Sequence, residues 1–197
     1  MKVVLLAGGL GTRLSEQTTT KPKPMVEVGG MPILWHIMNH YSYYGHNDFI
    51  ICLGYKGHVI KEFFSNYFLN NSDVTFDLEN NNTSFHSTNS RPWKVTLVNT
   101  GDLTMTGGRL KKVKKFLKQD EPFFMTYGDG VSDIDLNSLL KYHLDHGKLA
   151  TLSAVLPKER FGVLDINFSD NTVNSFKEKT SKKESFINGG FFVLNPK

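Results

Sequence analysis

A glycine-rich turn directly after the first apolar segment is the sequence feature best suited to chemistry. Residues Leu6–Leu14 read LAGGLGTRL. Glycines let backbone N–H groups approach a ligand that side chains would exclude, and successive amides form a concave anion site. The turn lacks the Lys-Ser or Lys-Thr of a P-loop, and Leu14 stands where a dinucleotide fingerprint needs a small residue. It therefore predicts either a phosphate site of another kind or only a tight turn after a strand.

A stiff basic loop follows downstream, where residues Lys21–Met25 read KPKPM. Proline fixes φ, so a lysine between two prolines loses little further entropy when it is held in one place. This suits a cation that must meet a transferring phosphoryl group. Taken alone, the same residues are equally compatible with a rigid polar loop.

An aspartate between two glycines ends a later apolar segment, where residues Thr126–Gly130 read TYGDG. Open α/β sheets bind their ligands at the carboxyl ends of strands, so Asp129 is expected to be exposed there. A carboxylate in that place can bind Mg²⁺, which takes oxygen ligands and usually keeps several waters. Asp135 lies nearby, but it is expected to cap a helix.

Short apolar segments alternate with segments of helical period, which predicts an α/β, Rossmann-like, mostly parallel sheet flanked by helices. Strands are expected at residues 3–7, 48–53, 95–99, 123–127 and 151–156, and helices at 32–44, 58–69 and 135–146. Residues 70–91 predict an excursion such as a hairpin. Residues 162–168 and 173–179 predict a small antiparallel sub-sheet, before a last strand at 191–194.

Composition sets the class of protein. The chain is 39% hydrophobic and 21% charged, which is typical of a globular protein, and its 197 residues fit one large domain or two very small ones. No apolar segment approaches the ~18 residues that cross a bilayer. The single cysteine, Cys52, lies in an apolar segment and suits a reducing cytoplasm. The net charge of +4 comes largely from lysines between residues 111 and 118, whose spacing favours a solvated helix face over a nucleic-acid site.

Five motifs, in this order and spacing, resemble the sugar-1-phosphate nucleotidylyltransferases along essentially the whole chain: Leu6–Leu14, Lys21–Met25, Gly128–Gly130, Phe176–Lys179 and Asn188–Phe191. Further segments are similar to the members of that family that use CTP and glucose 1-phosphate: Ile33–Met38, Gly54–Gly57, Asn66–Leu69, Thr104–Leu110 and Thr126–Val131. Each motif is weak alone, and the combination is specific.

The resemblance implies transfer of CMP from CTP to glucose 1-phosphate, which yields CDP-glucose and pyrophosphate. It implies Mg²⁺ as cofactor, CTP and glucose 1-phosphate as partners, and a cytoplasmic homo-oligomer that binds neither nucleic acid nor membrane. The implied catalytic residues are Arg13, Lys23 and Asp129, with Asp129 as metal ligand. The implied nucleotide-binding residues are Leu6, Ala7, Gly8, Gly9, Leu10, Gly11, Thr12, Arg13, Lys23, Thr104, Arg109 and Gly128. The implied sugar-phosphate-binding residues are Glu178, Lys179, Asn188 and Gly189.

Three other interpretations stay open on the sequence alone. A related uridylyl- or thymidylyltransferase shares the outer motifs, and a nucleotide-sugar sensor would need affinity without every charge-cancelling group. A nucleic-acid-binding module lacks a recognisable motif here. The resemblance also implies a C-terminal continuation with a second metal-binding aspartate, so residues 1–197 are expected to form a single truncated nucleotidylyltransferase domain with impaired activity.

Overall fold

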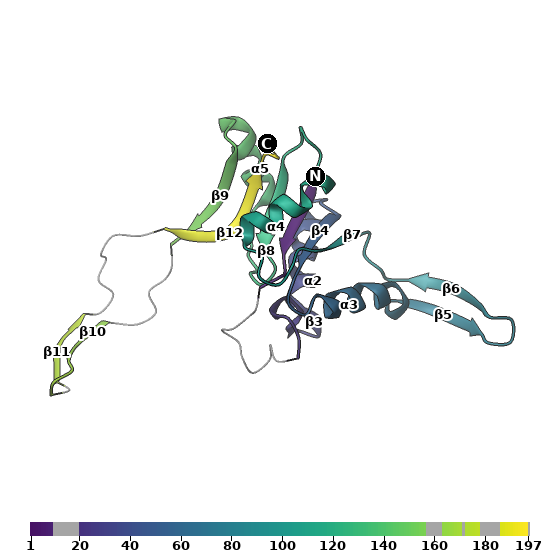
Figure 1. The fold of residues 1–197 in the computed structure, drawn as a ribbon, viewed down its shortest axis with the longest axis horizontal. Coiled ribbons are helices and arrows are strands. Elements are labelled where there is room, and N and C mark those ends of the chain that lie inside the picture. The colour runs from purple at the N-terminus through teal and green to yellow at the C-terminus, as the bar shows by residue number, and fades with distance from the viewer. Residues whose placement is uncertain (10–19, 157–162, 171, 178–185, 197) are drawn as a thin grey trace. The chain divides into compact units, whose positions relative to one another are not determined.

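The computed structural model describes residues 1–9, 20–156, 163–170, 172–177 and 186–196 (Figure 1). The chain separates into two compact units. One comprises Met1–Thr151 with Gly190–Lys197, and the other comprises Leu152–Gly189. That the whole chain forms a single catalytic domain stays a prediction.

A six-stranded sheet in the order β7-β4-β1-β8-β12-β9 forms the framework of the fold. Its strands are β1 (Lys2–Leu6), β4 (Asp48–Leu53), β7 (Lys94–Asn99), β8 (Phe123–Tyr127), β9 (Ala150–Val155) and β12 (Ile187–Leu194). Strand β1 pairs in parallel with β4 and β8, β4 pairs in parallel with β7, and β12 is antiparallel to β8. The mostly parallel, Rossmann-like sheet predicted from the sequence is confirmed.

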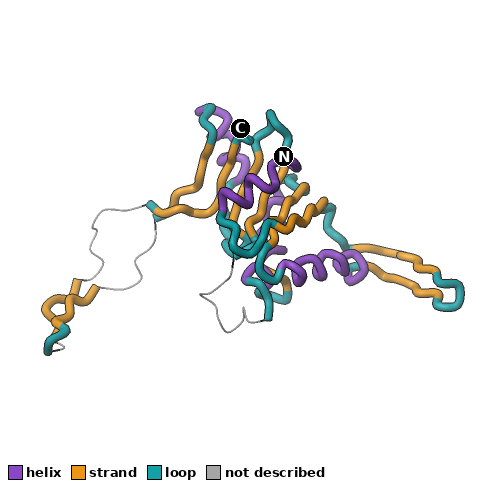
Figure 2. The backbone as a smooth tube through the Cα atoms, viewed as in Figure 1, coloured by secondary structure: helices purple, strands orange, loops and turns teal. Residues whose placement is uncertain are grey.

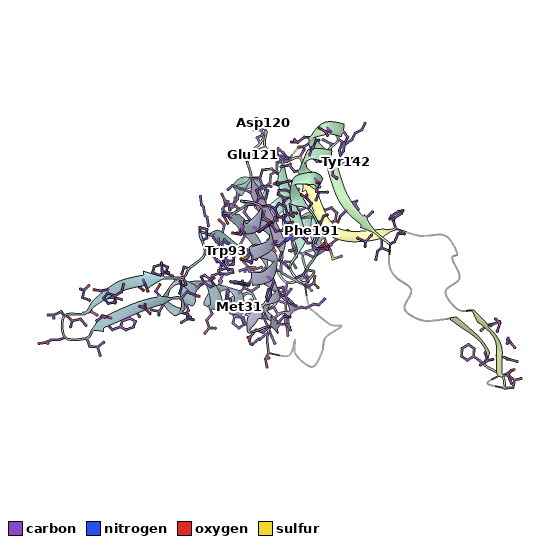
Figure 3. The ribbon with its side chains drawn as sticks, turned by 180° about the vertical axis from the view of Figure 1, so that it is seen from behind. Met31, Trp93, Asp120, Glu121, Tyr142 and Phe191 are labelled. Atoms are coloured by element: carbon purple, nitrogen blue, oxygen red, sulfur yellow. The ribbon has the colours of Figure 1, made fainter. Side chains whose placement is uncertain are left out.

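Helices cover both faces of this sheet. Successive residues of a strand point to opposite faces, so one strand can contribute to the core on each side. Val3 and Leu5 belong to one apolar core, which also holds residues of α2 (Ile33–Tyr43), α3 (Gly57–Asn70) and α5 (Leu136–His146). Val4 belongs to a second core with Val113 of α4 (Thr106–Val113). Strand β1 is therefore buried on both faces, which explains its apolar sequence. Phe191 of β12 stacks on Tyr41 with ring centroids 6.1 Å apart. Phe191 is labelled in Figure 3.

The helix boundaries follow the sequence signals closely. The expected helices at 32–44, 58–69 and 135–146 are α2, α3 and α5, each within one residue of the predicted ends. Asp135 caps α5 by accepting a hydrogen bond from the Ser138 N–H at 3.0 Å, as predicted. The short helix η3 (Lys114–Phe116) extends α4, and its lysines are exposed as a solvated face requires.

Small antiparallel elements complete the two units (Figure 2). The excursion at residues 70–91 is a hairpin of β5 (Ser72–Asp77) and β6 (Asn82–Thr88), and β2 (Glu27–Val28) pairs with β3 (Met31–Pro32). In the other unit, β10 (Val163–Asn167) pairs antiparallel with β11 (Thr172–Lys177), as predicted. Within the described ranges, no helix combines the length and apolar character needed to span a membrane.

We expect His46 to make the stability of the fold sensitive to mild acid. Its ring lies 4.8 Å from that of Phe124, and burial, followed by the N-terminal ammonium group, lowers the pKa of His46 below its ordinary value of 6.5. The folded state therefore favours the neutral ring, so this stabilisation is complete above about pH 6.5 and is lost as the pH falls below it. We expect the melting temperature of His46→Phe to fall less than that of the wild type when the pH is lowered from 7 to 5. Parallel melting curves from the two proteins would contradict this expectation.

Candidate active site

A cavity of about 440 Å³ lies at the carboxyl ends of the parallel strands. It is lined by the ends of β1 and β8, the loops after β1 and β7, the first turns of α4, and the short helix η2 (Lys23–Met25). Its described lining residues are Leu6, Ala7, Gly8, Gly9, Lys23, Pro24, Asp102, Leu103, Thr104, Met105, Thr106, Arg109, Tyr127 and Asp129. The structure thus brings together the glycine-rich turn, the basic loop and the TYGDG motif.

Arg109 ties the ends of three strands together beneath this cavity. Its guanidinium is almost fully buried, and burial lowers its pKa. Nη1 donates hydrogen bonds to the Leu53 carbonyl at 3.1 Å and to Thr100 Oγ1 at 2.6 Å. Nη2 donates to the carbonyls of Gly8, at 2.9 Å, and Asp102, at 3.2 Å. Arg109 therefore holds the loop after β1 against the ends of β4 and β7.

The glycine at position 8 is required by this close approach. A Cβ atom on Gly8 would lie 2.0 Å from Arg109 Nη1, and one on Gly54 would lie 2.6 Å from the Gly8 carbonyl oxygen. A Cβ on Gly9, by contrast, would meet no described atom within 4 Å. The turn is thus packed on the protein side at Gly8 and open at Gly9, which fits a backbone that presents its amides to a ligand.

Lys23 and Asp129 form an ion pair at the opposite side of the cavity. Lys23 Nζ lies 2.5 Å from Asp129 Oδ2, and both side chains are about one-third exposed. The buried residues Pro24 and Met25 anchor the lysine loop, and the Met25 N–H donates to the Pro22 carbonyl at 2.8 Å. Gly128 donates its N–H to the Leu6 carbonyl at 3.0 Å, which fixes the strand end that carries Asp129. This end of the cavity can therefore balance both an anion and a cation.

Several predicted site residues are not placed in this cavity. Leu10, Gly11, Thr12, Arg13, Glu178 and Lys179 lie outside the described residues. Asn188 and Gly189 belong to the unit Leu152–Gly189, where a Cβ on Gly189 would lie 2.7 Å from Ser153 Oγ. The roles assigned to all of these residues stay predictions.

The sequence interpretation missed Asp102 and Leu103, which line the cavity from the loop after β7. Met105, Thr106 and Tyr127 also line it; they lie in segments that carry the family resemblance, but no site role was assigned to them. Asp102 follows the carboxyl end of a parallel strand, and that position was the signal that could have found it.

The fold and this cavity agree with what comparison of the sequence finds. Residues 2–197 match the family model for nucleotidyl transferases, and the chain belongs to that family. A crystal structure of HddC from Yersinia pseudotuberculosis has the same fold, with a TM-score of 0.65 and 28% identity, covering 99% of this chain and 76% of that one.

Two curated relatives are more similar to this chain than that structure is, and both are named for one activity. The chain is 60% identical over 196 residues to the glucose-1-phosphate cytidylyltransferase of Salmonella typhimurium, covering 100% of this chain and 76% of the relative. It is 45% identical over 197 residues to a probable glucose-1-phosphate cytidylyltransferase of Bacillus subtilis, with the same coverage. The predicted resemblance to sugar-1-phosphate nucleotidylyltransferases is confirmed.

Nucleotidyltransferases of this family generally use a divalent metal ion. The described residues contain no cluster of three or more His, Cys, Asp or Glu side chains that could hold a metal ion by themselves. Asp129 offers one partly exposed carboxylate beside a cationic lysine. That donor set fits a hard cation that takes most of its oxygen ligands from water and substrate phosphates.

Proposed function

We propose that this chain transfers CMP from CTP to α-D-glucose 1-phosphate, forming CDP-glucose and releasing pyrophosphate, with Mg²⁺ as the divalent cation. The observation that carries the proposal is the 60% identity, over the whole chain, to a relative named glucose-1-phosphate cytidylyltransferase. The cavity supports it, because the glycine-rich turn, the basic loop and the TYGDG motif, which the proposal assigns to the nucleotide and the metal, meet there.

The reaction needs positioning and charge balance more than it needs a protein nucleophile. An oxygen of the sugar phosphate forms a bond to the α-phosphorus of CTP, while the bond from that phosphorus to the bridging oxygen breaks and pyrophosphate leaves. Two anions must approach in line, so the site must cancel their repulsion. In this proposal the amides of the glycine-rich turn and the Lys23 ammonium hold the phosphates, and Arg13 adds a further charge.

Asp129 is proposed to hold Mg²⁺, which would neutralise phosphate charge when bound. Lys23 and Asp129 form an ion pair, and about two-thirds of each side chain is buried, so both groups are already desolvated in part and lie at one point of the cavity. Glu178, Lys179, Asn188 and Gly189 are proposed to bind the sugar phosphate. The homo-oligomer and the cytoplasmic location stay predictions.

Pyrophosphate release tests the proposal. The chain would be assayed with each of CTP, UTP, dTTP, ATP and GTP, with and without glucose 1-phosphate and Mg²⁺. We expect release with CTP, only when both other components are present, and with UTP as the nearest competitor. Faster turnover of UTP or dTTP would favour a related transferase, and nucleotide binding without release would favour a sensor. Either result would contradict the proposal.

Asp129→Asn is expected to raise the Mg²⁺ concentration that gives half-maximal rate by on the order of tenfold or more, because an amide is a weaker ligand than a carboxylate. A Mg²⁺ titration at saturating CTP measures the change. Asp133→Asn is the matched control, since Asp133 is exposed and does not line the cavity. Equal Mg²⁺ requirements in the wild type and Asp129→Asn would remove Asp129 as metal ligand.

A further inference from the structure

The two sides of the cavity differ in chemistry. Lys23 and Asp129 lie at the β8 side, and the loop after β7 lies at the other. Strands β4 and β1 stand between β7 and β8, so about 14 Å separates the two strand ends at ~4.8 Å per strand. The β8 side carries the cation that suits phosphates, which leaves the β7 side for the base.

The β7 side offers an apolar surface and one carboxylate. Leu103 and Met105 line the cavity, and they are 84% and 81% exposed. A flat base could bury part of this apolar surface by packing against it. Asp102 lies directly before them. Asp102 and Asp129 are the two carboxylates among the described lining residues.

The backbone of Asp102 is held in place. The preceding Gly101 has φ of +90° and donates its N–H to Asn99 Oδ1 at 3.0 Å. The Asp102 carbonyl accepts the hydrogen bond from the buried Arg109 guanidinium described above. The residue is thus positioned by the same arginine that holds the glycine-rich turn.

The neighbouring polar groups are already engaged. Both terminal nitrogens of Arg109 donate to protein acceptors. Thr104 Oγ1 donates to the Thr100 carbonyl at 2.6 Å and accepts from Lys112 Nζ at 3.1 Å. Asp102 is the one carboxylate among the described residues that line this side of the cavity, and it is exposed, so a ligand can reach it.

A carboxylate repels a nucleoside triphosphate unless it meets a hydrogen-bond donor. On the base of CTP that donor is the exocyclic amino group, whereas UTP carries a carbonyl oxygen at the same position. We propose that the Asp102 carboxylate accepts a hydrogen bond from the exocyclic amino group of cytosine and so sets the preference for CTP over UTP. This inference rests on the proposed function and identifies a specificity-determining residue for it.

The same carboxylate would both attract cytosine and reject uracil. With UTP, a carbonyl oxygen would face the carboxylate and leave two acceptors opposed without a proton between them. Discrimination of this kind is large when the wrong ligand leaves polar groups unpaired. An amide at position 102 would remove it, because the side chain of asparagine can rotate to donate or to accept.

The first test compares the ratio of kcat/KM for CTP to that for UTP in the wild type and in Asp102→Asn. We expect the ratio to fall by about 10- to 100-fold, through a loss with CTP and a gain or no change with UTP. Asp145→Asn, which replaces an exposed aspartate on α5, is the control. A parallel melting curve verifies that the Asp102 variant folds.

A second test removes the donor from the substrate. The triphosphate of the pyrimidin-2-one riboside lacks the exocyclic group but keeps the ring, ribose and phosphates. The wild type should use CTP at least tenfold better than this analogue, and Asp102→Ala should use the two within about threefold, as a double-mutant cycle requires. Equal losses with CTP, UTP and the analogue would place Asp102 on the ribose and overturn the inference. A wild type that does not prefer CTP would instead overturn the proposed function.

Discussion

Lys23→Ala is expected to lower kcat by about 10²–10³-fold, the usual cost of removing one preorganised group that stabilises developing charge. Lys23 lines the cavity on the β8 side, where the phosphates are proposed to bind. Its side chain is partly exposed, and its ammonium group pairs with Asp129. Its pair with Asp129 is partly solvated, so its loss should leave the melting temperature nearly unchanged. Initial rates at saturating CTP, glucose 1-phosphate and Mg²⁺ measure the effect.

Lys21→Ala is the matched control for this prediction. Lys21 belongs to the same proline-stiffened loop, but it is half exposed and pairs with Glu27 at 2.6 Å, outside the cavity. We expect this variant to retain most of the wild-type rate. Similar losses in the two variants would mean that the loop as a whole, and not the Lys23 charge, matters for turnover.

Gly8→Ala is expected to destabilise the fold by about 3 kcal/mol or more and to abolish nucleotide binding. The new methyl group would overlap the Arg109 guanidinium, whose displacement would leave the carbonyls of Gly8 and Asp102 without that donor. The Leu53 carbonyl would keep its hydrogen bonds from the N–H and the hydroxyl of Thr100. Urea unfolding and CTP binding measured by calorimetry test both consequences.

Gly9→Ala separates this packing effect from a general effect of alanine in the turn. A methyl group there would meet no described atom, and Gly9 is not among the described glycines with positive φ. Its free energy of unfolding should therefore stay within about 0.5 kcal/mol of the wild type. If Gly8→Ala unfolds at the same urea concentration as Gly9→Ala, the packing of Gly8 against Arg109 does not stabilise the fold, and our assignment is wrong.

The elements of the fold could be predicted because each carries a local periodic signal. The segment Phe49–Leu53 is buried throughout, and Asp135 caps α5 as its position before an apolar period indicates. The order of the strands has no such local signal. It depends on which strands pair, and so on contacts between segments that are far apart in the sequence. Local signals therefore could not place the β7 loop beside the turn after β1. The family resemblance implied it through Thr104 and Arg109, and the cavity brings the two segments together.

The candidate site was predictable where glycine, proline and charge occur together in one motif. Gly8, Lys23 and Asp129 were found in this way, and all three line one cavity. Asp102 was not found, because a single aspartate after a strand is common and its meaning depends on the arginine that holds its backbone. Arg109 was assigned to the nucleotide, whereas its two terminal nitrogens bond to the protein, and its contact with nucleotide stays a prediction.

Transfer of label from CTP tests the central claim most directly. The chain would be incubated with glucose 1-phosphate, Mg²⁺ and CTP that carries ³²P at either the α- or the γ-position, and the products would be separated by chromatography. The account predicts that the α-label moves into CDP-glucose and the γ-label into pyrophosphate, at equal rates. Label that stays in CTP, or an α-label that appears in free CMP without CDP-glucose, would contradict it.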